Sequence, residues 1–570
     1  MSEEKEKKIT GGDLLIKALI CENVRYMFGV PGGQFLTMYD AIYNWGREHG
    51  IDTILMRHEQ AAAHAADAWG RVTGTPGVCF GTVGPGATHL VPGIGAAWSD
   101  NIPVVAIVPQ TNRQYTDMGI LQGDLDQITM FKPITKCQRH VVSTDQIPQA
   151  VQKVFREAVT GRPRPVLLEI AEEALIGQID DISLPECSLT RFSGRVGGDP
   201  KLINDAVDAF INAKKPLLIA GGGIHMSDAS TELTELAEYL SVPVGTSIMG
   251  VGAIQSEKCI LGASLVSSAV MKAVNEADCI LILGSKLSFT LGFGDKRFWN
   301  PDATIIQVDI DPSIIAKNRT VNIGIVGDCK LVLQQILQGV KSKVTSEKPI
   351  SEWLNSLKAI RQAAKDAIEK KTAKEKSPIL PQKIIKDIYE FMDDDAVVII
   401  DGGDIAVFAM EQIDFYKPRP SRSTLNAVGM GHLGTAVAYA VGAKLAKPDK
   451  QVIAICGDGS FLINVQDLDT LIRYNLPVIF CIANNSAWGM IKSGQKLFMK
   501  KRFIDVDIPG TNYTEIAKGF GCHAERVDNS NEIKTALQRA VDSKKPAVIE
   551  IITDWKIPAG TELMGSMGIL

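Results

Sequence analysis

The stretch that decides the fold is residues 451–489, QVIAICGDGSFLINVQDLDTLIRYNLPVIFCIANNSAWG. The apolar run 452–456 predicts a buried strand that ends in the turn GDGS, and apolar residues at helical spacing follow it. The run 477–483 predicts a second buried strand, closed by two asparagines. Strand, glycine-rich turn, helix and strand form a right-handed crossover unit. We therefore expect Asp458 and Asn485 at the carboxyl edge of one parallel sheet.

The residue types at this edge fit an anionic ligand with a metal ion. Glycines let the backbone approach a phosphate closely, and a helix that starts after Ser460 would offer free N–H groups to it. The oxygens of Asp458 and Asn485 are hard donors, suited to Mg²⁺ held against a diphosphate. The alternative is an ordinary strand–turn–helix in which Asp458 only caps the helix.

Composition limits the class of protein. A chain of 570 residues is too long for one core and predicts about three domains. A net charge of −5 without a basic stripe argues against nucleic-acid binding. The start MSEEKEKK has no apolar core of a signal peptide, and no run of 18 apolar residues occurs, so we expect a cytoplasmic protein that does not enter membranes. The ten cysteines lack CxxC spacing and predict free thiols.

Glu59 is a further carboxylate of interest. It follows a predicted strand and opens an alanine-rich helix, where an unpaired charge is costly. Taken alone, a glutamate in the first turn of a helix ordinarily compensates the helix dipole. The surrounding sequence RHEQAAAHAADAWGR, residues 57–71, is what favours a functional role.

The two motifs together resemble those of thiamine diphosphate-dependent enzymes. The GDG…NN arrangement, with Asn485 placed 27 residues after Asp458 (485 − 458), is similar to their diphosphate-binding motif, and RHEQAAAHAADAWGR is similar to their glutamate motif. The resemblance covers essentially the whole chain and is to the acetolactate synthase superfamily. It implies an α/β fold of three doubly wound parallel-sheet domains. The implied parts are a pyrimidine-binding domain (1–185), a central nucleotide-type domain (195–345), a charged helix and linker (346–379), a diphosphate- and Mg²⁺-binding domain (380–556) and a tail that is a candidate lid (557–570).

The resemblance also implies the residues of the cofactor site. It places Glu59 on N1′ of the pyrimidine, the Gly431 carbonyl on the 4′-amino group and Leu433 beneath the thiazolium ring. It makes Asp458, Asn485 and the Ala487 carbonyl the Mg²⁺ ligands. Gln34 and Gln122 are the implied donors to the reacting oxygen of the substrate, and with Glu59 they form the predicted catalytic set. The other predicted cofactor contacts are Pro31, Gly403, Asp404, Gly457, Gly459, Ser460, Trp488, Gly489 and Met490.

The middle of the chain resembles the central domain of the same superfamily in the segments LILGSKL, IIQVDID and GIVGDC. Members of the superfamily hold FAD, ADP or nothing there. The nucleotide contacts that would follow are Gly222, Gly223, Lys286, Asp309 and Asp328. For the three charged residues, surface salt bridges are the alternative.

Two departures from acetolactate synthases bear on the substrate. Thr290 replaces the family's substrate-carboxylate arginine, and Gly494 replaces its pocket tryptophan. The segments SFTLGFG and DGGDIAVFA resemble 2-hydroxyacyl-CoA lyases. The main expectation is therefore cleavage of a 2-hydroxyacyl-CoA to formyl-CoA plus an aldehyde or ketone, with the reverse condensation. The alternatives are acetolactate synthase-type carboligation of pyruvate, benzaldehyde lyase-type ligation of aldehydes, and a non-catalytic member of the family.

The resemblance has a consequence for assembly. In the superfamily, the glutamate and the metal ligands that hold one cofactor come from different subunits. We therefore expect a homodimer or homotetramer in which Glu59 of one chain and Asp458 of another share a site.

Overall fold

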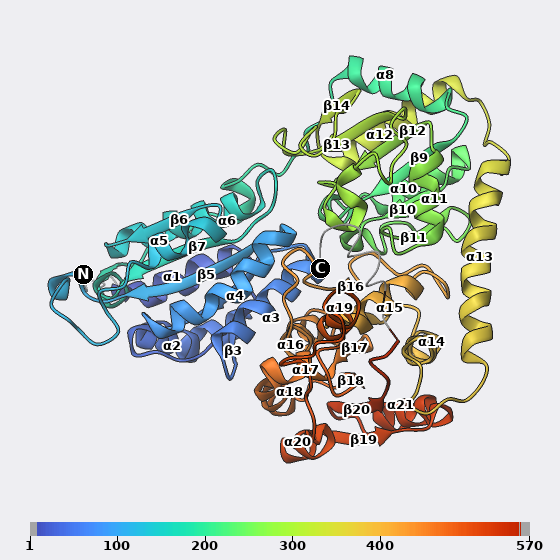
Figure 1. Cartoon of the computed structure of the whole chain (residues 1–570). Helices are drawn as coiled ribbons and strands as arrows, with labels where there is room; N and C mark the ends of the chain where they lie inside the picture. The colour runs from blue at the N-terminus through green and yellow to red at the C-terminus, as the bar shows by residue number, and fades with distance from the viewer. Residues whose placement is uncertain (1–7, 558, 560–570) are drawn as a thin grey trace. The chain divides into compact units, whose positions relative to one another are not determined.

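The computed structural model describes residues 8–557 and 559, and it contains three six-stranded sheets in which every strand is parallel to its neighbours (Figure 1). Each sheet is built from strands that alternate with helices along the chain. The inner strands are mostly runs of buried apolar residues, whereas several edge strands are only partly buried. Parallel strands need such crossover helices, because consecutive strands must return to the same end of the sheet. The predicted α/β class with three parallel-sheet domains is confirmed.

The first sheet has the strand order β3-β2-β4-β5-β7-β6. Its strands are β2 (Tyr26–Gly29), β3 (Asp52–Leu55), β4 (Gly77–Phe80), β5 (Val104–Gln110), β6 (Gln138–Val141) and β7 (Val166–Ala171). The helices between and around them are α1 (Gly11–Cys21), α2 (Leu36–Ala41), α3 (Glu59–Thr73), α4 (Pro85–Asp100), α5 (Gln127–Phe131), α6 (Ile147–Val159) and α7 (Glu172–Ile176). A short antiparallel pair, β1 (Lys8–Thr10) with β8 (Gln178–Asp180), joins the start of this part to its end.

The third sheet along the chain has the order β16-β15-β17-β18-β20-β19, which is the strand order of the first sheet when each set is numbered from its own first strand. Its strands are β15 (Val397–Ile400), β16 (Thr424–Leu425), β17 (Val452–Gly457), β18 (Ile479–Asn484), β19 (His523–Val527) and β20 (Ala547–Ile552). The helices of this part are α14 (Pro381–Phe391), α15 (Asp404–Gln412), α16 (Ala436–Ala446), α17 (Asp458–Phe461), α18 (Leu468–Arg473), α19 (Gly489–Phe498), α20 (Tyr513–Gly519) and α21 (Ile533–Asp542).

The central sheet has a different order, β11-β10-β9-β12-β13-β14. Numbered from its own first strand this is 3-2-1-4-5-6, the order of dinucleotide-binding folds, whose ligand crevice lies beside the first strand where the order reverses. The strands are β9 (Pro216–Ala220), β10 (Val244–Thr246), β11 (Ile260–Ala263), β12 (Cys279–Leu283), β13 (Thr304–Asp309) and β14 (Ile323–Val326). The helices are α8 (Pro200–Ile211), α9 (Gly223–Met226), α10 (Ser230–Leu240), α11 (Ser268–Glu276) and α12 (Cys329–Lys343).

The charged segment after the central sheet forms one long helix, α13 (Glu352–Thr372). Most of its Lys and Glu side chains are exposed, while Trp353, Leu354 and Leu357 are buried. The expected solvated helix is therefore present, with an apolar beginning that anchors it. Among the described residues, no helix is long and apolar enough to cross a membrane.

Spatial contacts divide the described residues into two compact units. The first unit holds the residues up to Gly194 together with Gly429–Pro448 and Asn464–Leu476, and the second holds the remainder. Two segments that begin more than 230 positions after Gly194 (429 − 194) therefore group, by contact, with the first sheet.

The sequence predicts one helical stretch after Ser460, and the structure contradicts this prediction. The structure begins helix α17 at Asp458 and breaks the helical path at Asn464, whose φ of −127° and ψ of 29° are not helical. The side-chain amide of Asn464 donates to the carbonyl of Gly434 at 2.7 Å. Asparagine commonly exchanges helical geometry for such side chain–backbone bonds, so regular helix resumes only at α18. The apolar periodicity of the segment carries no sign of this break.

Candidate active site

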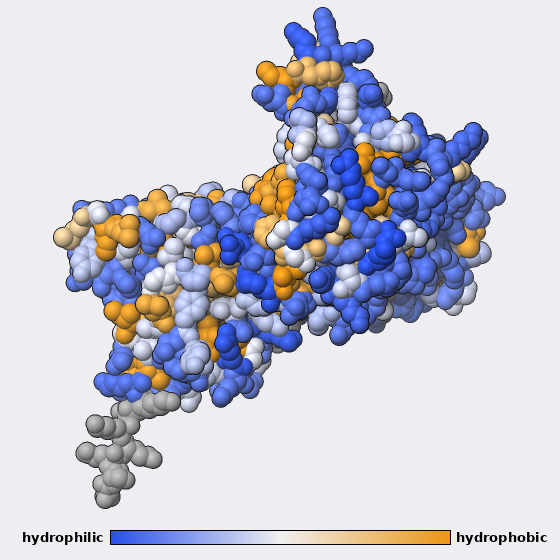
Figure 2. All heavy atoms as spheres, turned by 90° about the horizontal axis from the view of Figure 1, so that it is seen from below, coloured by the Kyte–Doolittle hydropathy of each residue, from blue (hydrophilic) through white to orange (hydrophobic). Residues whose placement is uncertain are grey.

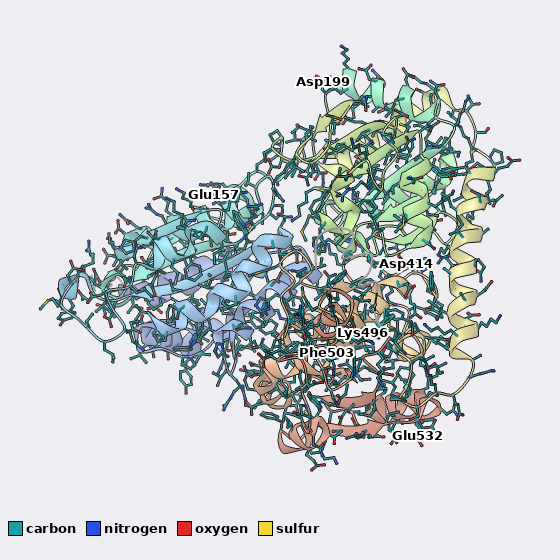
Figure 3. The ribbon with its side chains drawn as sticks, viewed as in Figure 1. Glu157, Asp199, Asp414, Lys496, Phe503 and Glu532 are labelled. Carbon is teal, nitrogen blue, oxygen red and sulfur yellow. The ribbon has the colours of Figure 1, made fainter. Side chains whose placement is uncertain are left out.

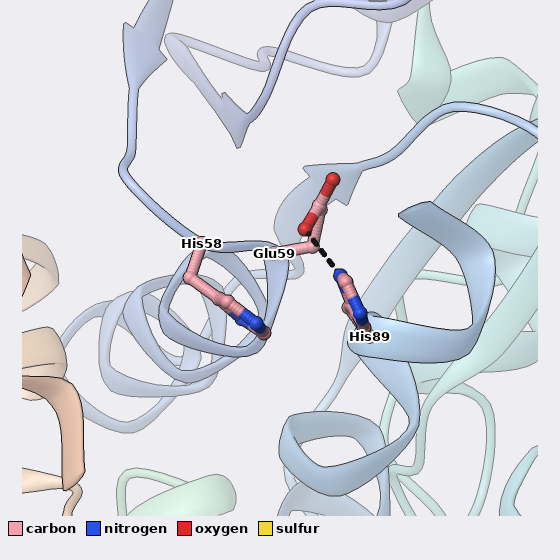
Figure 4. Close-up of side chains that lie close together, drawn as sticks. All are labelled: His58, Glu59 and His89. Carbon is pink, nitrogen blue, oxygen red and sulfur yellow. Dashed lines mark hydrogen bonds and ion pairs between the residues drawn. The ribbon is translucent and has the colours of Figure 1, made fainter. Parts of the chain in front are cut away.

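Glu59 is the first residue of α3, and His58 caps the helix before it. The Nδ1 atom of His58 accepts a hydrogen bond from the backbone N–H of Gln60 at 3.1 Å. Glu59 is buried and its Oε2 lies 3.0 Å from Nδ1 of His89, a residue of α4 (Figure 4). The other carboxylate oxygen points away from both imidazole rings (Figure 4). A carboxylate so placed can hold a ring nitrogen through its second oxygen; we call this cluster, His58, Glu59 and His89, the ring half-site.

A buried ionic network lies farther along α3. The Arg71 guanidinium donates to both oxygens of Asp67, at 2.9 and 3.0 Å, and to Oδ2 of Asp100 at 2.9 Å. The hydroxyl of Tyr439 on α16 donates to Asp67 as well. Burial raises the pKa of Asp67, and Arg71 opposes that rise. Because charges this deeply buried need partners, the network fixes α3 against α4 and α16 in one arrangement.

The network also holds the glycine turn that precedes α16. The second oxygen of Asp100, Oδ1, accepts the backbone N–H of Gly429 at 3.0 Å, and a Cβ added to Gly429 would lie 2.2 Å from that oxygen. Gly431 follows with a φ of 66° and open space where a Cβ would stand, so this position favours glycine on conformational grounds alone. The Leu433 carbonyl lies 2.7 Å from Nδ1 of His432. The turn that carries Gly431 and Leu433 thus belongs to the same compact unit as Glu59.

The two predicted glutamines lie in the first sheet's domain at glycine-rich turns. The Oε1 atom of Gln34 accepts from the Thr82 hydroxyl at 2.8 Å, so the donor end of this side chain is its amide N–H₂ group. Gln122 has a φ of 65°, and its carbonyl would stand 2.7 Å from a Cβ added at Gly84. Pro31 lies in the turn between β2 and the short helix that contains Gln34. These positions are consistent with pocket donors, and their roles remain predictions.

Asp458, Ser460 and Asn485 form the centre of a second cluster, the diphosphate half-site. Asp458 follows β17 and is buried, and among the described residues no side chain donates to its Oδ2 atom. Burial raises the pKa of Asp458 to about 6, against a lowering effect from the backbone N–H groups of Gly459 and Ser486. Asn485 follows β18, and its Oδ1 accepts from the N–H of Ala487 at 3.1 Å. Ser460 donates to Asp401 at 2.5 Å.

Asp404 lies beside this cluster as the first residue of α15. A Cβ added to Gly489 would stand 2.4 Å from Oδ2 of Asp404 and 2.6 Å from Nδ2 of Asn485, so glycine there lets the two side chains approach. No described side chain is hydrogen-bonded to either oxygen of Asp404, and burial raises its pKa to about 7. The backbone N–H of Ala559 opposes that rise. A buried carboxylate without a side-chain partner typically marks a ligand or metal site.

The remaining predicted contacts of the half-site border the same loops. A Cβ on Gly403 would meet the Met490 side chain at 3.3 Å, and one on Gly459 would meet the Trp488 ring at 2.9 Å. Gly457 has open space at its Cβ position. Beyond them, α19 and the segment after it carry Lys496 and Phe503, which Figure 3 labels. The Phe503 ring packs edge-on against Trp555 with centroids 5.7 Å apart.

Comparison with known families shows which family the chain belongs to. The N-terminal binding domain of thiamine pyrophosphate enzymes matches residues 9–130, their central domain matches 203–336, and their C-terminal binding domain matches 401–551. Thiamine pyrophosphate is thiamine diphosphate under its other name. The chain belongs to the thiamine diphosphate enzymes. The predicted membership in the acetolactate synthase superfamily is confirmed by the relatives.

Those relatives are similar over nearly the full length. The chain is 35% identical to a probable acetolactate synthase large subunit of Methanococcus aeolicus, with 96% of this chain and 92% of the relative covered. It is 34% identical to the acetolactate synthase large subunit of Corynebacterium glutamicum (96% and 87% covered) and 32% identical to acetolactate synthase isozyme 3 large subunit of Escherichia coli (94% and 92% covered).

The predicted nucleotide contacts of the central domain make contacts within the protein itself. Asp328 caps α12 and accepts two 2.9 Å hydrogen bonds from Arg195. A Cβ at Gly223 would stand 2.6 Å from the Cα of Gly284, and one at Gly222 would stand 3.3 Å from Met249. Asp309 accepts the N–H of Asp311 at 2.9 Å, and Lys286 lies in the loop after β12. Packing between two backbone turns is thus a sufficient reason for these glycines, and a nucleotide stays a prediction.

Sequence reasoning missed the roles of His58 and His89 in the ring half-site, and it missed the Arg71–Asp100 pair in the buried network of this thiamine diphosphate enzyme. The motif RHEQAAAHAADAWGR contains His58, Asp67 and Arg71, and helical spacing alone predicts the Asp67–Arg71 pair at i and i+4. The contacts to His89 and Asp100 join α3 to α4, and the local sequence does not predict them.

Proposed function

We propose that this protein is a thiamine diphosphate- and Mg²⁺-dependent carboligase of the acetolactate synthase type, which joins the acyl unit of one 2-keto acid such as pyruvate to a second keto acid. The observation that carries the proposal is the 35% identity to acetolactate synthase large subunits over 96% of the chain. An α/β fold by itself would support many chemistries. The similarity is supported by the buried carboxylates Glu59 and Asp458, which are the residues that the proposed cofactor contacts require.

The residues present fit this cofactor. The Asp458 oxygen without a side-chain partner and the neighbouring Asn485 amide supply hard donors for Mg²⁺, with the Ala487 carbonyl as third protein ligand. Open Cβ positions at Gly457 and Gly431 let backbone approach a ligand. When bound, thiamine diphosphate supplies a nucleophilic carbon that adds to a carbonyl and accepts the electron pair left by C–C cleavage.

The protein's own groups position that chemistry. Glu59 would hold the pyrimidine N1′ through its second oxygen, together with the proton shared there. The Gly431 carbonyl would accept from the 4′-amino group, and the apolar Leu433 side chain would support the thiazolium ring. Gln34 and Gln122 would donate to the oxygen of the carbonyl under attack, where neutral amides stabilise developing charge without being consumed.

Cleavage of a 2-hydroxyacyl-CoA is the second candidate. It is favoured by Thr290, which is buried and uncharged where a receptor for a substrate carboxylate is expected, and by Gly494, whose Cβ position is open. An open wall on α19 would admit a long acyl-CoA. The names of the relatives favour the keto acid reaction over it, and benzaldehyde lyase-type ligation or a non-catalytic role has no observation of its own.

One experiment separates these candidates. The purified protein, loaded with thiamine diphosphate and Mg²⁺, is incubated with pyruvate, with other 2-keto acids, with aldehydes and with 2-hydroxyacyl-CoA thioesters, and the products are identified by mass spectrometry. The proposal expects a 2-hydroxy-3-keto acid from pyruvate with release of CO₂. Formyl-CoA as the only product, with pyruvate untouched, would transfer the assignment to the second candidate. Cofactor binding without turnover of any member of the panel would indicate a non-catalytic protein.

We further propose that the active site is completed by a second copy of the chain. Support comes from exposed apolar side chains on the first unit, where Leu36, Met118 and Leu121 are 69%, 71% and 82% exposed. Figure 2 shows apolar patches of this kind among polar surface. Mixing inactive Glu59→Gln chains with inactive Asp458→Ala chains should restore activity, because one site of each mixed dimer has both residues. Mixtures that stay inactive while wild-type controls recover would contradict a shared site.

A further inference from the structure

Glu59 has one side-chain hydrogen-bond partner among the described residues, and that partner is titratable. Nδ1 of His89 lies 3.0 Å from Oε2 of Glu59. An ionised carboxylate has only acceptor atoms, so the proton in this bond is on His89 Nδ1. The side chain of Glu59 is 10% exposed and that of His89 is 46% exposed, so the imidazole links a buried carboxylate to solvent.

His58, the third member of the cluster, keeps one protonation state. Nδ1 of His58 is occupied as the acceptor of the Gln60 N–H, which leaves the neutral ring with its proton on Nε2. Burial lowers the pKa of His58, and the neighbouring His89 lowers it further. The two rings are stacked, with centroids 4.5 Å apart and planes 28° apart (Figure 4). A second positive charge in this stack is unfavourable, and the ring that is hydrogen-bonded to Glu59 is that of His89.

Other charges near the cluster are already paired. Arg57, the residue before His58, has its side chain 3.8 Å from Asp469, and its backbone N–H donates to Asp467. The uncharged backbone of Gly81 also packs against Glu59, since a Cβ added there would stand 3.2 Å from Cγ of Glu59. The titratable groups that face one another here are therefore His58, Glu59 and His89.

We propose that His89 is a positioning residue that aims Glu59 through its Nδ1–H bond and balances the proton that Glu59 gains when the cofactor ring binds. This inference rests on the proposed role of Glu59. In the empty site the pair is a carboxylate beside an imidazolium. When Glu59 takes a proton on Oε1 to hold the ring nitrogen, His89 releases one proton from Nε2 to water and keeps the Nδ1–H bond to Oε2. The pair has the same number of protons before and after.

The consequence is measurable as proton uptake. With asparagine at position 89, a side-chain N–H can still donate to Glu59, but the group cannot titrate. Each cofactor bound must then draw one proton from solvent. Its affinity falls by up to about tenfold for each rise of one pH unit once Glu59 is ionised in the cofactor-free protein. The wild-type protein avoids this fall as long as His89 can release the matching proton.

The test uses wild type, His89→Asn and His89→Ala, with His523→Asn as the control. His523 forms a comparable pair with Glu525 at 2.7 Å on β19. Calorimetry of thiamine diphosphate binding, between pH 5.5 and 8 in buffers of different ionisation enthalpy, gives the affinity and the number of protons exchanged. We expect His89→Asn to take up close to one proton more than wild type near pH 6 and to lose affinity several-fold by pH 7. His89→Ala should lose affinity at every pH as well, and the control should match wild type.

Superimposable proton counts and pH profiles for wild type and His89→Asn would overturn the inference. A readout without cofactor keeps this outcome distinct from failure of the proposed function. In the cofactor-free protein, ¹⁵N NMR of the histidine rings should show His89 protonated on Nδ1, and Glu59→Ala should shift it to the Nε2–H form. If that pair is observed but wild type binds no thiamine diphosphate, the proposed function is wrong. An Nε2–H form in wild type would overturn the inference itself.

Discussion

Replacing Arg71 by methionine should destabilise the first unit severely. Arg71 is 5% exposed and makes three hydrogen bonds of 2.9 to 3.0 Å to Asp67 and Asp100, both buried. Methionine retains most of the aliphatic volume, so little of the effect comes from a cavity. Removal of one member of a buried ion group leaves the others uncompensated and costs about 3 to 5 kcal/mol. Lysine at position 71 keeps the charge but not the two-pronged geometry, and should cost clearly less.

Urea unfolding is monitored by circular dichroism, and the first unfolding transition is compared between variants. Hydrogen exchange locates the change within the chain. Peptides from α3 and α16 should lose protection first. The triple variant Arg71→Met, Asp67→Asn, Asp100→Asn should recover much of the loss, because no buried charge is then left unpaired. A loss below about 1 kcal/mol for Arg71→Met, or a triple variant that is no better than the single one, would refute the reasoning.

Three further predictions concern other residues. Glu59→Gln should keep the fold and lose most of kcat, because an amide cannot hold the shared proton; near-normal turnover at saturating cofactor would contradict its role. The cofactor-free protein should lose stability as pH rises from about 4 to 7: the pKa of Asp404 in the folded state is raised to about 7 by burial, so the folded state retains a proton that the unfolded state has released. This effect is on the order of 2 to 4 kcal/mol, and urea unfolding of Asp404→Asn should show a flatter pH dependence. Gly494→Ala should raise stability by about 0.5 to 1 kcal/mol, because the position is inside helix α19 with open space at Cβ; thermal unfolding checks this, and a loss of stability would contradict it.

The parts of the fold that follow from local sequence were predictable. Apolar runs such as 452–456 and 477–483 predicted buried parallel strands, and the polar turns after them predicted the carboxyl edge of the sheet. The break at Asn464 was not predictable, because it depends on a hydrogen bond to Gly434, thirty positions away (464 − 434). The spacing of apolar residues along a helix does not show that a polar side chain will bond to a distant backbone carbonyl.

The site divides in the same way. Glu59, Asp458 and Asn485 stand in motifs whose spacing is visible in one dimension. His89 gains its meaning only because α4 packs beside the beginning of α3, and Asp100 only because it reaches the N–H of Gly429. The substrate expectation failed to rank the candidates as the relatives do, since it relied on two absent side chains, at Thr290 and Gly494. The absence of a side chain removes one contact with a substrate. It does not identify the substrate that the pocket binds.

The central claim is that this chain binds thiamine diphosphate by its diphosphate through Mg²⁺ on Asp458. The direct test is calorimetric titration of metal-free, cofactor-free protein with thiamine diphosphate, with and without Mg²⁺, for wild type, Asp458→Ala and the exposed control Asp449→Ala. We predict saturable, Mg²⁺-dependent binding for wild type and the control. Asp458→Ala should bind at least about a hundredfold more weakly, as expected when a buried charge partner is removed, and without a Mg²⁺ effect. Unchanged affinity and unchanged Mg²⁺ dependence in Asp458→Ala would contradict the account.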